Sequence, residues 1–463
     1  MRRNFRLPAL SLAAIAAALA AALPHPALAG QFVIEHVTLI DGTGSAPRPD
    51  MTVTVDGDTI TGVTPSAAAA ANLPGVRIDA RGKYLMPGLM DIHIHLRSRL
   101  SGSILDKGGK PDLTVAREAL ASFVYDGVTT VFDAGNSADV ILPLRDEERA
   151  GKLASPRIFA TGNLVTYPGS HGDAVAVRVS DFEKDRALID AHIAEQKPDL
   201  VKFTYDEEGW GARPMITLMP LDELQKLTQY YNQHGIRTTV HISNEKRAEE
   251  AMSVGIDTLA HPVIQGPVSD DFVRLMGAKK TPFATTLTIG ENYSRLVEHP
   301  EYLDQADYAA SFSAKERAYL KSTTRAEYQA RTWTWWMKLM TPICMENIRK
   351  VVAGGGVAAL GTDQSSGPAV HREMELLVKA GIPTAQVIRI ATLNGAIFLG
   401  KQDRLGSVEP GKLADLLLLD ADPLADIDNA RRIAWVMKGG TIIDESKLAL
   451  AGGPQPKRYS GPQ

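Results

Sequence analysis

Hydrophobic and polar positions divide the chain into three zones. The first zone is strand-like, and the alternation from Met51 to Val63 predicts a hairpin that turns at Asp56-Gly57. In the second zone, short β-rich runs alternate with amphipathic helical patterns as far as Asp363. After Gly400 strand patterns return, with a turn at Gly439-Gly440. The chain therefore mixes a β-rich part, contributed by both ends, with a central α/β part.

The central zone contains eight strand patterns separated mostly by helical ones. Eight strand–helix units in succession predict an α/β fold of the TIM-barrel type, a (β/α)₈ barrel. A doubly wound open sheet is the alternative. The helical patterns include Leu113–Tyr125, Leu221–His234 and Glu245–Val254. The strand patterns are Tyr84–Ile94, Gly127–Asp133, Arg157–Thr166, Asp199–Tyr205, Arg237–Ile242, Thr258–Pro262, Thr281–Ile289 and Gly356–Asp363.

A long helical stretch interrupts the alternation at about residues 291–350, between the seventh and eighth strand patterns. It carries the tryptophan-rich segment Arg331–Met337. Two interpretations stay open, aromatic packing in added helices and a lid over the barrel mouth. Residues 452–463 are rich in Gly and Pro and predict a flexible tail.

The N-terminal segment 1–29 has the pattern of a signal peptide. Three arginines precede an apolar run from Ala9 to Leu23, and Ala27-Leu28-Ala29 forms a cleavage site before Gly30. The apolar run is shorter than the roughly 20 residues that span a membrane. We therefore expect export to the periplasm or outside the cell, without a stable membrane anchor.

Composition narrows the classes of function. The 463 residues carry a net charge of −4 and contain no Lys/Arg-rich block, which argues against a nucleic-acid partner. Cys344 is the single cysteine, so no disulfide forms within the chain. No histidine neighbours Cys344 in the sequence, and we interpret it as a buried apolar residue. The sequence leaves open whether the chain forms a homo-oligomer.

Metal-binding side chains recur at the C-terminal ends of the predicted barrel strands, where barrel enzymes place their reactive groups. His93 and His95 point to the same side of one strand because strand side chains alternate with period two. Imidazoles and a carboxylate suit Zn, Fe, Mn or Ni, and we expect zinc. The six candidate ligands are His93, His95, Lys202, His241, His261 and Asp363.

Lys202 is the unusual member of this set. A lysine with the ordinary pKa of about 10.4 would be positively charged and would repel the metals. Desolvation and neighbouring cations lower a lysine pKa, and the neutral amine adds carbon dioxide to become an anionic carbamate. We therefore expect N6-carboxylation of Lys202, which would let it bridge two divalent ions.

At this point the chain resembles the metal-dependent amidohydrolase superfamily. The motif Pro87–His95 is similar to the first-strand signature of that family, and Asp126–Val131, Gly361–Asp363 and Gly406–Asp415 are similar to other family segments. The resemblance covers about residues 33–443. It is strongest to the branch of imidazolonepropionase-like and Xaa-Pro dipeptidase-like hydrolases.

The resemblance implies a domain layout and a division of the ligands. Residues 31–84 and 404–445 would form a small β-sandwich domain, beside a barrel at residues 85–403. His93, His95 and Asp363 would bind one metal, His241 and His261 the other, and carboxylated Lys202 would bridge them. One-metal deaminases of the family carry His-x-x-Glu at the fifth strand, whereas this chain has Asn244 in place of the glutamate.

The reaction that we expect is hydrolysis of an amide C–N bond in a dipeptide or N-acyl amino acid. Asp363 is the predicted catalytic residue, which would accept the proton of a metal-bound water and pass it to the leaving nitrogen. His171, Arg97 and Tyr205 are candidate substrate-binding residues. Alternatives are a cyclic amide or lactone hydrolase, a one-metal deaminase on the same fold, and a non-catalytic metal-binding protein.

Overall fold

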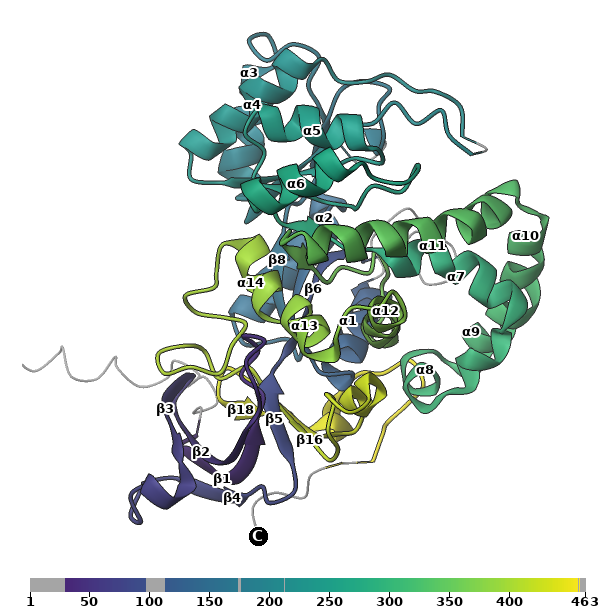
Figure 1. Cartoon of the computed structure of the whole chain (residues 1–463). Helices are drawn as coiled ribbons and strands as arrows, with labels where there is room; N and C mark the ends of the chain where they lie inside the picture. The colour runs from purple at the N-terminus through teal and green to yellow at the C-terminus, as the bar shows by residue number, and fades with distance from the viewer. Residues whose placement is uncertain (1–29, 97–112, 174–175, 212, 457, 459–463) are drawn as a thin grey trace, which may run out of the picture.

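The computed structural model describes residues 30–96, 113–173, 176–211, 213–456 and 458 (Figure 1). The predicted signal peptide and Arg97 lie outside the described residues. No helix in these ranges is long and apolar enough to cross a membrane.

A mixed sheet of eight strands joins the two ends of the chain and lies at the bottom of Figure 1. The predicted hairpin around Asp56-Gly57 is confirmed, with Asp56 paired to Thr59. The strands are β1 (Phe32–Leu39), β2 (Arg48–Asp56), β3 (Thr59–Pro65), β4 (Val76–Asp79), β5 (Tyr84–Pro87), β16 (Leu416–Leu419), β17 (Ile433–Lys438) and β18 (Thr441–Ile442).

This small sheet curls around a core of its own. Ile60 of the edge strand β3 and Trp435 of β17 belong to the same buried cluster, although many strands separate them in the sheet. Ile60 N donates to Lys412 O at 2.8 Å, and Ala414 N donates to Asp58 O at 2.7 Å. These bonds fold the edge strand back onto the segment that leads into β16, so the sheet encloses its apolar face.

The central part of the chain is a TIM-barrel-type arrangement of parallel strands. Its strands are β6 (Leu89–Ile94), β7 (Val128–Asp133), β8 (Arg157–Ala160), β9 (Leu164–Thr166), β11 (Leu200–Thr204), β12 (Arg237–His241), β13 (Thr258–Leu259), β14 (Phe283–Ala284) and β15 (Ala358–Ala359), with β10 (Ala176–Arg178) beside β9.

Neighbouring barrel strands follow one another in chain order, as a barrel requires and a doubly wound sheet does not. Strands β6, β7 and β8 form one ladder, and β9 to β15 form a second. Backbone hydrogen bonds join the two ladders: Asp199 N donates to Ala160 O at 2.9 Å, and Ile92 N donates to Leu360 O at 2.9 Å. The second bond brings the first strand beside the last.

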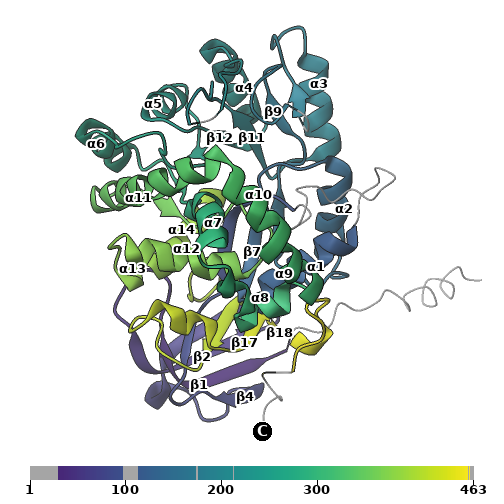
Figure 2. The ribbon, with the colours of Figure 1, turned by 90° about the vertical axis from the view of Figure 1, so that its right-hand side faces the viewer.

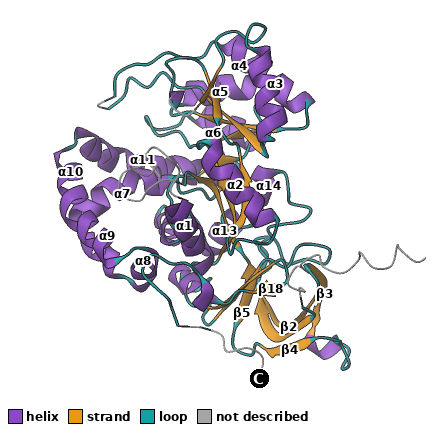
Figure 3. Cartoon of the chain, turned by 180° about the vertical axis from the view of Figure 1, so that it is seen from behind, coloured by secondary structure: helices purple, strands orange, loops and turns teal. Residues whose placement is uncertain are grey.

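Helices cover the strands from outside, as Figure 3 shows by secondary structure. The predicted helix Leu113–Tyr125 has the observed bounds. The helices outside the insertion are α1 (Leu113–Tyr125), α2 (Ala138–Arg149), α3 (Arg186–Ala191), α4 (Leu221–Gln233), α5 (Glu245–Ser253), α6 (Asp270–Lys279), α12 (Pro368–Lys379), α13 (Thr384–Ile390) and α14 (Leu393–Leu399).

The stretch between β14 and β15 is helical and forms a block along one side of the barrel (Figure 2). We call residues 287–353 the helical insertion. Tyr302, Tyr308 and Phe312 belong to a buried cluster of its own. Its helices are α7 (Leu287–Glu298), α8 (Ala306–Ser311), α9 (Ala314–Tyr319), α10 (Arg325–Ala330) and α11 (Thr332–Ala353).

Several predicted strands were wrong in extent. Arg157–Thr166 forms two strands, β8 and β9, in different ladders, and Thr258–Pro262 and Gly356–Asp363 form strands only at Thr258–Leu259 and Ala358–Ala359. The pattern Tyr84–Ile94 breaks at Gly88, so that β5 joins the small sheet and β6 joins the barrel. A Cβ at Gly88 would lie 2.1 Å from Thr129 Oγ1, which shows how closely the backbone passes the neighbouring strand. The pattern Thr281–Ile289 forms a strand only at Phe283–Ala284, because the backbone N–H groups of Leu287 and Thr288 donate to the buried Glu373 carboxylate and begin α7 there.

The C-terminal end packs on the helical insertion and on α1 at two described positions within the predicted tail. Gly452 N donates to Ala310 O at 2.9 Å, and Arg458 Nη1 donates to Tyr125 O at 3.1 Å. These bonds hold the chain where the Gly/Pro-rich composition alone predicts flexibility.

Gly440 tests the closure of the small sheet. A Cβ at Gly440 would lie 1.8 Å from Gly57 O, whereas a Cβ at Gly439 would meet nothing within 4 Å, and both glycines have positive φ. We expect Gly440→Ala to lower the free energy of unfolding by about 2–5 kcal/mol, the sum of left-handed strain and a backbone clash. The matched control Gly439→Ala has the strain alone, about 1–2 kcal/mol. Urea unfolding measures both, and equal effects would contradict the close approach.

Candidate metal centre

The candidate ligands lie on or just after the C-terminal ends of barrel strands. His93 is in β6 and His95 follows it, and Lys202 is in β11. His241 ends β12. His261 and Asp363 follow β13 and β15 within a few residues. Five separate strands thus deliver the set to one end of the barrel.

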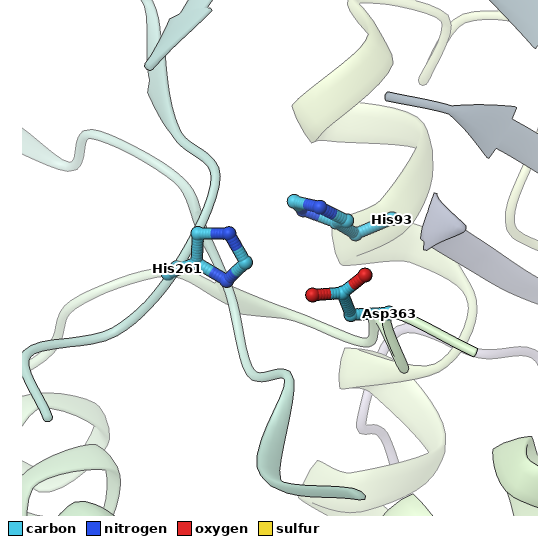
Figure 4. A group of neighbouring side chains, drawn as sticks. All are labelled: His93, His261 and Asp363. Carbon is cyan, nitrogen blue, oxygen red and sulfur yellow. The ribbon is translucent and has the colours of Figure 1, made fainter. Parts of the chain in front are cut away.

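Three of these residues form a compact centre (Figure 4). His93, His261 and Asp363 each offer one ligand atom, and the three atoms lie within 4.8 Å of one another. Figure 4 shows both imidazoles and the carboxylate turned toward a common space. This trio combines members of both predicted metal sites, so the two sites would be adjacent.

The other three predicted ligands adjoin the trio. His95 Nε2 lies 3.6 Å from Asp363 Oδ1, and Lys202 Nζ lies 3.0 Å from His93 Nε2. The ring centroids of His241 and His261 are 4.6 Å apart. The structure therefore brings together all six side chains that the sequence singles out.

Asp91 of β6, the first barrel strand, is hydrogen-bonded to the segment that follows β15, the last barrel strand, beside this centre. Its buried carboxylate accepts hydrogen bonds from Thr362 N at 3.0 Å and from Thr362 Oγ1 at 2.6 Å. Asp363 N in turn donates to His93 O at 2.7 Å. Sequence reasoning missed this role, although Asp91 shares the period-two face of His93 and His95.

Each of three imidazoles has one ring nitrogen directed at a partner outside the centre. His95 Nδ1 donates to Gly135 O at 2.5 Å, and His261 Nδ1 lies 3.0 Å from Thr286 Oγ1. His241 Nε2 lies 3.4 Å from Asp206 Oδ2. Ligating histidines in proteins are oriented in this way, with the second nitrogen left for the metal.

His241 supplies a direct test of whether the site fits a cation. Its Nδ1 is buried and has no hydrogen-bond partner among the described residues. A buried nitrogen without a partner is unfavourable unless something else satisfies it, and a metal ion does so. Together with the N/O donor set, this atom shows that the residues present fit divalent metal ions.

Burial keeps the imidazoles in the form that binds metals. Desolvation lowers the pKa of His93, His241 and His261 below the ordinary histidine value, and the neighbouring cationic groups lower it further. Neutral imidazole is the ligating form of histidine. Cys344 is buried in α11 and desolvation raises its pKa, in agreement with the structural interpretation of this residue.

His171 is brought to the centre by a loop. Its ring stacks on the His241 ring with centroids 4.1 Å apart and an interplanar angle of 11°. His171 Nδ1 lies 2.9 Å from Glu208 Oε1, which also accepts a hydrogen bond from Arg213 Nη1 at 2.8 Å. The loop after β11 therefore positions His171 over the candidate ligand His241.

The same loop reaches the tryptophan-rich helix α11. Arg213 lies over the Trp333 ring at 4.3 Å, and the Trp210 and Trp333 ring centroids are 5.0 Å apart. The segment Arg331–Met337, for which packing and lid interpretations stayed open, thus packs against a loop that carries Glu208. Contacts run from the insertion to His171 and on to the metal centre.

Tyr205 lies on the other side of its strand from Lys202. Only 2% of Tyr205 is exposed, and its hydroxyl donates to Glu250 Oε2 of α5 at 2.9 Å. Because side chains alternate along a strand, Lys202 faces the centre and Tyr205 faces the outer helix. This placement argues for packing and against the expected substrate contact.

A cavity of about 560 Å³ opens between the helical insertion and the loop that carries Asp363. We call it the insertion cavity. Asp363 lies at its barrel side, and the insertion's aromatic cluster forms its opposite wall. Sequence reasoning did not predict this cavity, because its walls come from segments far apart in the chain.

Comparisons with known proteins show the family and the fold of the chain. The amidohydrolase family profile matches residues 84–443, from β5 to the end of the small sheet. An imidazolonepropionase from Shouchella clausii is 30% identical over 417 residues, which cover 81% of this chain and 79% of the relative. An imidazolonepropionase from Phocaeicola vulgatus is 25% identical over 408 residues, with 80% and 86% covered. The crystal structure of a Xaa-Pro dipeptidase with bound methionine is similar with a TM-score of 0.69 and 24% identity, covering 89% of this chain and 99% of that one.

Asp206 is expected to orient His241 as a metal ligand. We predict that Asp206→Asn lowers metal affinity by about 10- to 100-fold, the usual effect of losing such a partner. Competition with a chelator of known affinity measures it. The matched control is Glu207→Gln, which removes the adjacent carboxylate, bonded instead to Arg247. Equal affinity in the two variants would remove Asp206 from this role.

Proposed function

The chain belongs to the amidohydrolase family and is a hydrolase that acts on C–N bonds; we propose that it is an exported, binuclear enzyme that cleaves the amide of a dipeptide or N-acyl amino acid. The observation that carries the proposal is the convergence of four imidazoles, one lysine and one carboxylate at the barrel mouth. A non-catalytic protein has no evident need for such a complete ligand set.

The proposed assignment of ligands keeps two ions in one site. His93, His95 and Asp363 would hold one, His241 and His261 the other, and Lys202 as a carbamate would be shared. Lys202 is buried, with 3% exposed, and its amine lies beside a ligand imidazole. A charged ammonium there would repel both ions, whereas a carbamate supplies two anionic oxygens. Zinc is the proposed metal because it accepts this mixture of nitrogen and oxygen ligands.

The protein side chains would carry the proton movements of the reaction. Bound metal ions supply a hydroxide nucleophile near neutral pH and polarise the scissile carbonyl. Asp363 lies at the junction of the centre and the insertion cavity, where it would accept the proton of the nucleophilic water. The same carboxyl would then donate that proton to the leaving nitrogen. His171, held over His241 by Glu208, would contact the carbonyl side of the substrate.

The position of Asn244 supports hydrolysis over one-metal deamination. Asn244 Oδ1 accepts a hydrogen bond from Arg247 N at 2.9 Å and caps α5. A deaminase of this fold would need a glutamate acid–base group at this position. Here the residue begins a helix instead, and no catalytic proton carrier takes its place there.

A second candidate substrate class is a cyclic amide. Imidazolonepropionases are the relatives at 30% and 25% identity, and their name denotes a cyclic substrate. The insertion cavity of about 560 Å³ favours the larger, open-chain amides. A screen of dipeptides, N-acyl amino acids, lactams and lactones with the metal-loaded protein distinguishes the two. Hydrolysis confined to the cyclic compounds would overturn the open-chain substrate and leave the metal centre intact.

Metal content and Lys202 test the binuclear proposal together. Elemental analysis of protein grown with zinc is expected to approach about two ions per chain, as in other two-metal hydrolases. Lys202→Ala should lose metal and activity, with partial rescue by short carboxylic acids that replace the carbamate. A stoichiometry capped at one ion in a fully active enzyme would refute the binuclear site.

Asp363→Asn tests the proton transfer. We expect kcat for amides to fall by about 10²–10⁴, the usual range for one acid–base group. Activated esters should lose less, because their leaving groups need no proton. Metal content must be measured in the same samples, since Asp363 is also a proposed ligand. An equal loss on amides and esters at full metal content would exclude Asp363 as the proton donor.

Export is tested by the mature N-terminus. Because Ala27-Leu28-Ala29 matches a signal-peptidase site, protein recovered from the periplasm or medium is expected to begin at Gly30. N-terminal sequencing decides the point. Exported protein that retains Met1 would contradict cleavage, and protein confined to the cytoplasm would contradict export.

A further inference from the structure

We propose that the insertion cavity binds a carboxylate of the substrate at Arg295 and an aromatic or large aliphatic group against the surrounding rings. This inference rests on the proposed function of the metal centre and deepens it by naming the substrate class. The cavity places Asp363 and Arg295 in one continuous space, so that a single ligand can contact both.

Arg295 is held in a defined position by two buried rings. Its guanidinium lies over the Tyr302 ring at 3.9 Å, and its Nη1 donates to Tyr308 Oη at 2.9 Å. Tyr302 is 8% exposed and Tyr308 is 6% exposed. A planar cation fixed by stacking and a hydrogen bond retains other N–H donors for a ligand, in the fork geometry that suits carboxylates.

The charge of Arg295 has no carboxylate partner within 4.0 Å in the part of the chain that the structure describes. Nearby acids are paired elsewhere: Glu291 accepts from Arg372 Nη2 at 2.7 Å, and Asp307 pairs with Arg431. Glu327 also lines the cavity, on an exposed turn of α10. A half-buried arginine usually has an anionic partner, and a bound carboxylate would supply one.

One wall of the cavity is aromatic and aliphatic, and polar side chains, among them Arg331 and Arg372, line the rest. Such surface binds an apolar group by the area that it removes from water, roughly 25 cal/mol per Å². A cavity that joins the oriented guanidinium of Arg295 to an apolar wall therefore favours an amphipathic acid over a purely polar one. The apolar wall residues are Tyr293, Leu296, Tyr302, Leu303, Tyr308 and Phe312.

Calorimetric binding of two matched ligands to the metal-loaded protein tests the proposal. The probes are 3-phenylpropionate and neutral 3-phenylpropan-1-ol, which share the ring and differ in the charged group. Arg295→Gln is expected to weaken binding of the acid by about 10- to 100-fold and to leave the alcohol unchanged. Arg317→Gln, on α9 of the same insertion and outside the cavity lining, removes an equal charge and should bind both ligands as the wild type does.

Arg295→Lys provides a second variant that keeps the charge. It should bind the acid more weakly than the wild type, because lysine lacks the planar fork that stacks on Tyr302. Wild-type affinity for the acid in either Arg295 variant would overturn the proposal, since the acid would then bind through the metals or through another arginine of the cavity. Equal loss of both ligands in Arg295→Gln, or no binding of the acid by the wild type, would overturn it as well.

Hydrolysis of N-acetyl-phenylalanine by the wild type reports separately on the proposed function. If 3-phenylpropionate binding depends on Arg295 but N-acetyl-phenylalanine is not hydrolysed, the proposed reaction is refuted and the carboxylate site at Arg295 stands. If the wild type hydrolyses this compound but the Arg295 variants bind the acid as the wild type does, the carboxylate site at Arg295 is refuted and the proposed reaction stands.

Discussion

The junction between the first and last barrel strands is the constraint on which the site depends. Ile92 donates to Leu360, Thr362 donates to the buried Asp91 carboxylate, and the Asp363 amide donates to the His93 carbonyl. These bonds close the circuit of parallel strands and set Asp363 beside His93. Without these bonds, nothing described here would hold Asp363 close to His93 and His95.

Electrostatics then decides what this junction can hold. Imidazoles and a lysine amine crowded into a buried space cannot all be protonated, and desolvation lowers the pKa of three of the imidazoles. Asp206 and Asp363 place negative charge on two sides of the cluster. A neutral donor set flanked by carboxylates favours divalent cations, which is the physical basis of the metal dependence of this family.

The helical insertion connects the metal centre to the substrate side. Trp333 of α11 contacts Trp210 and Arg213, and Arg213 reaches Glu208, which lies beside His171. The insertion cavity lies between this block and Asp363. Packing of the insertion therefore positions His171 over His241 and also shapes the space next to Asp363. These contacts agree with the packing interpretation of the tryptophan-rich segment, and the lid interpretation stays a prediction.

Sequence by itself determined the local properties of this protein: the order of strands and helices, the hairpin at Asp56-Gly57, and the six ligand candidates at strand ends. These properties follow from the periodicity and the chemistry of residues that are close together in the sequence. Tertiary structure alone decided where the patterns break. Tyr84–Ile94 divides between two domains because Gly88 passes Thr129 closely, and α7 begins where Glu373, far along the chain, accepts its first N–H groups. It likewise decided that Tyr205 packs outward, that Asp206 supports His241, and that Arg295 lines the cavity with Asp363. Each of these depends on contacts between residues distant in sequence, and no local pattern encodes such contacts.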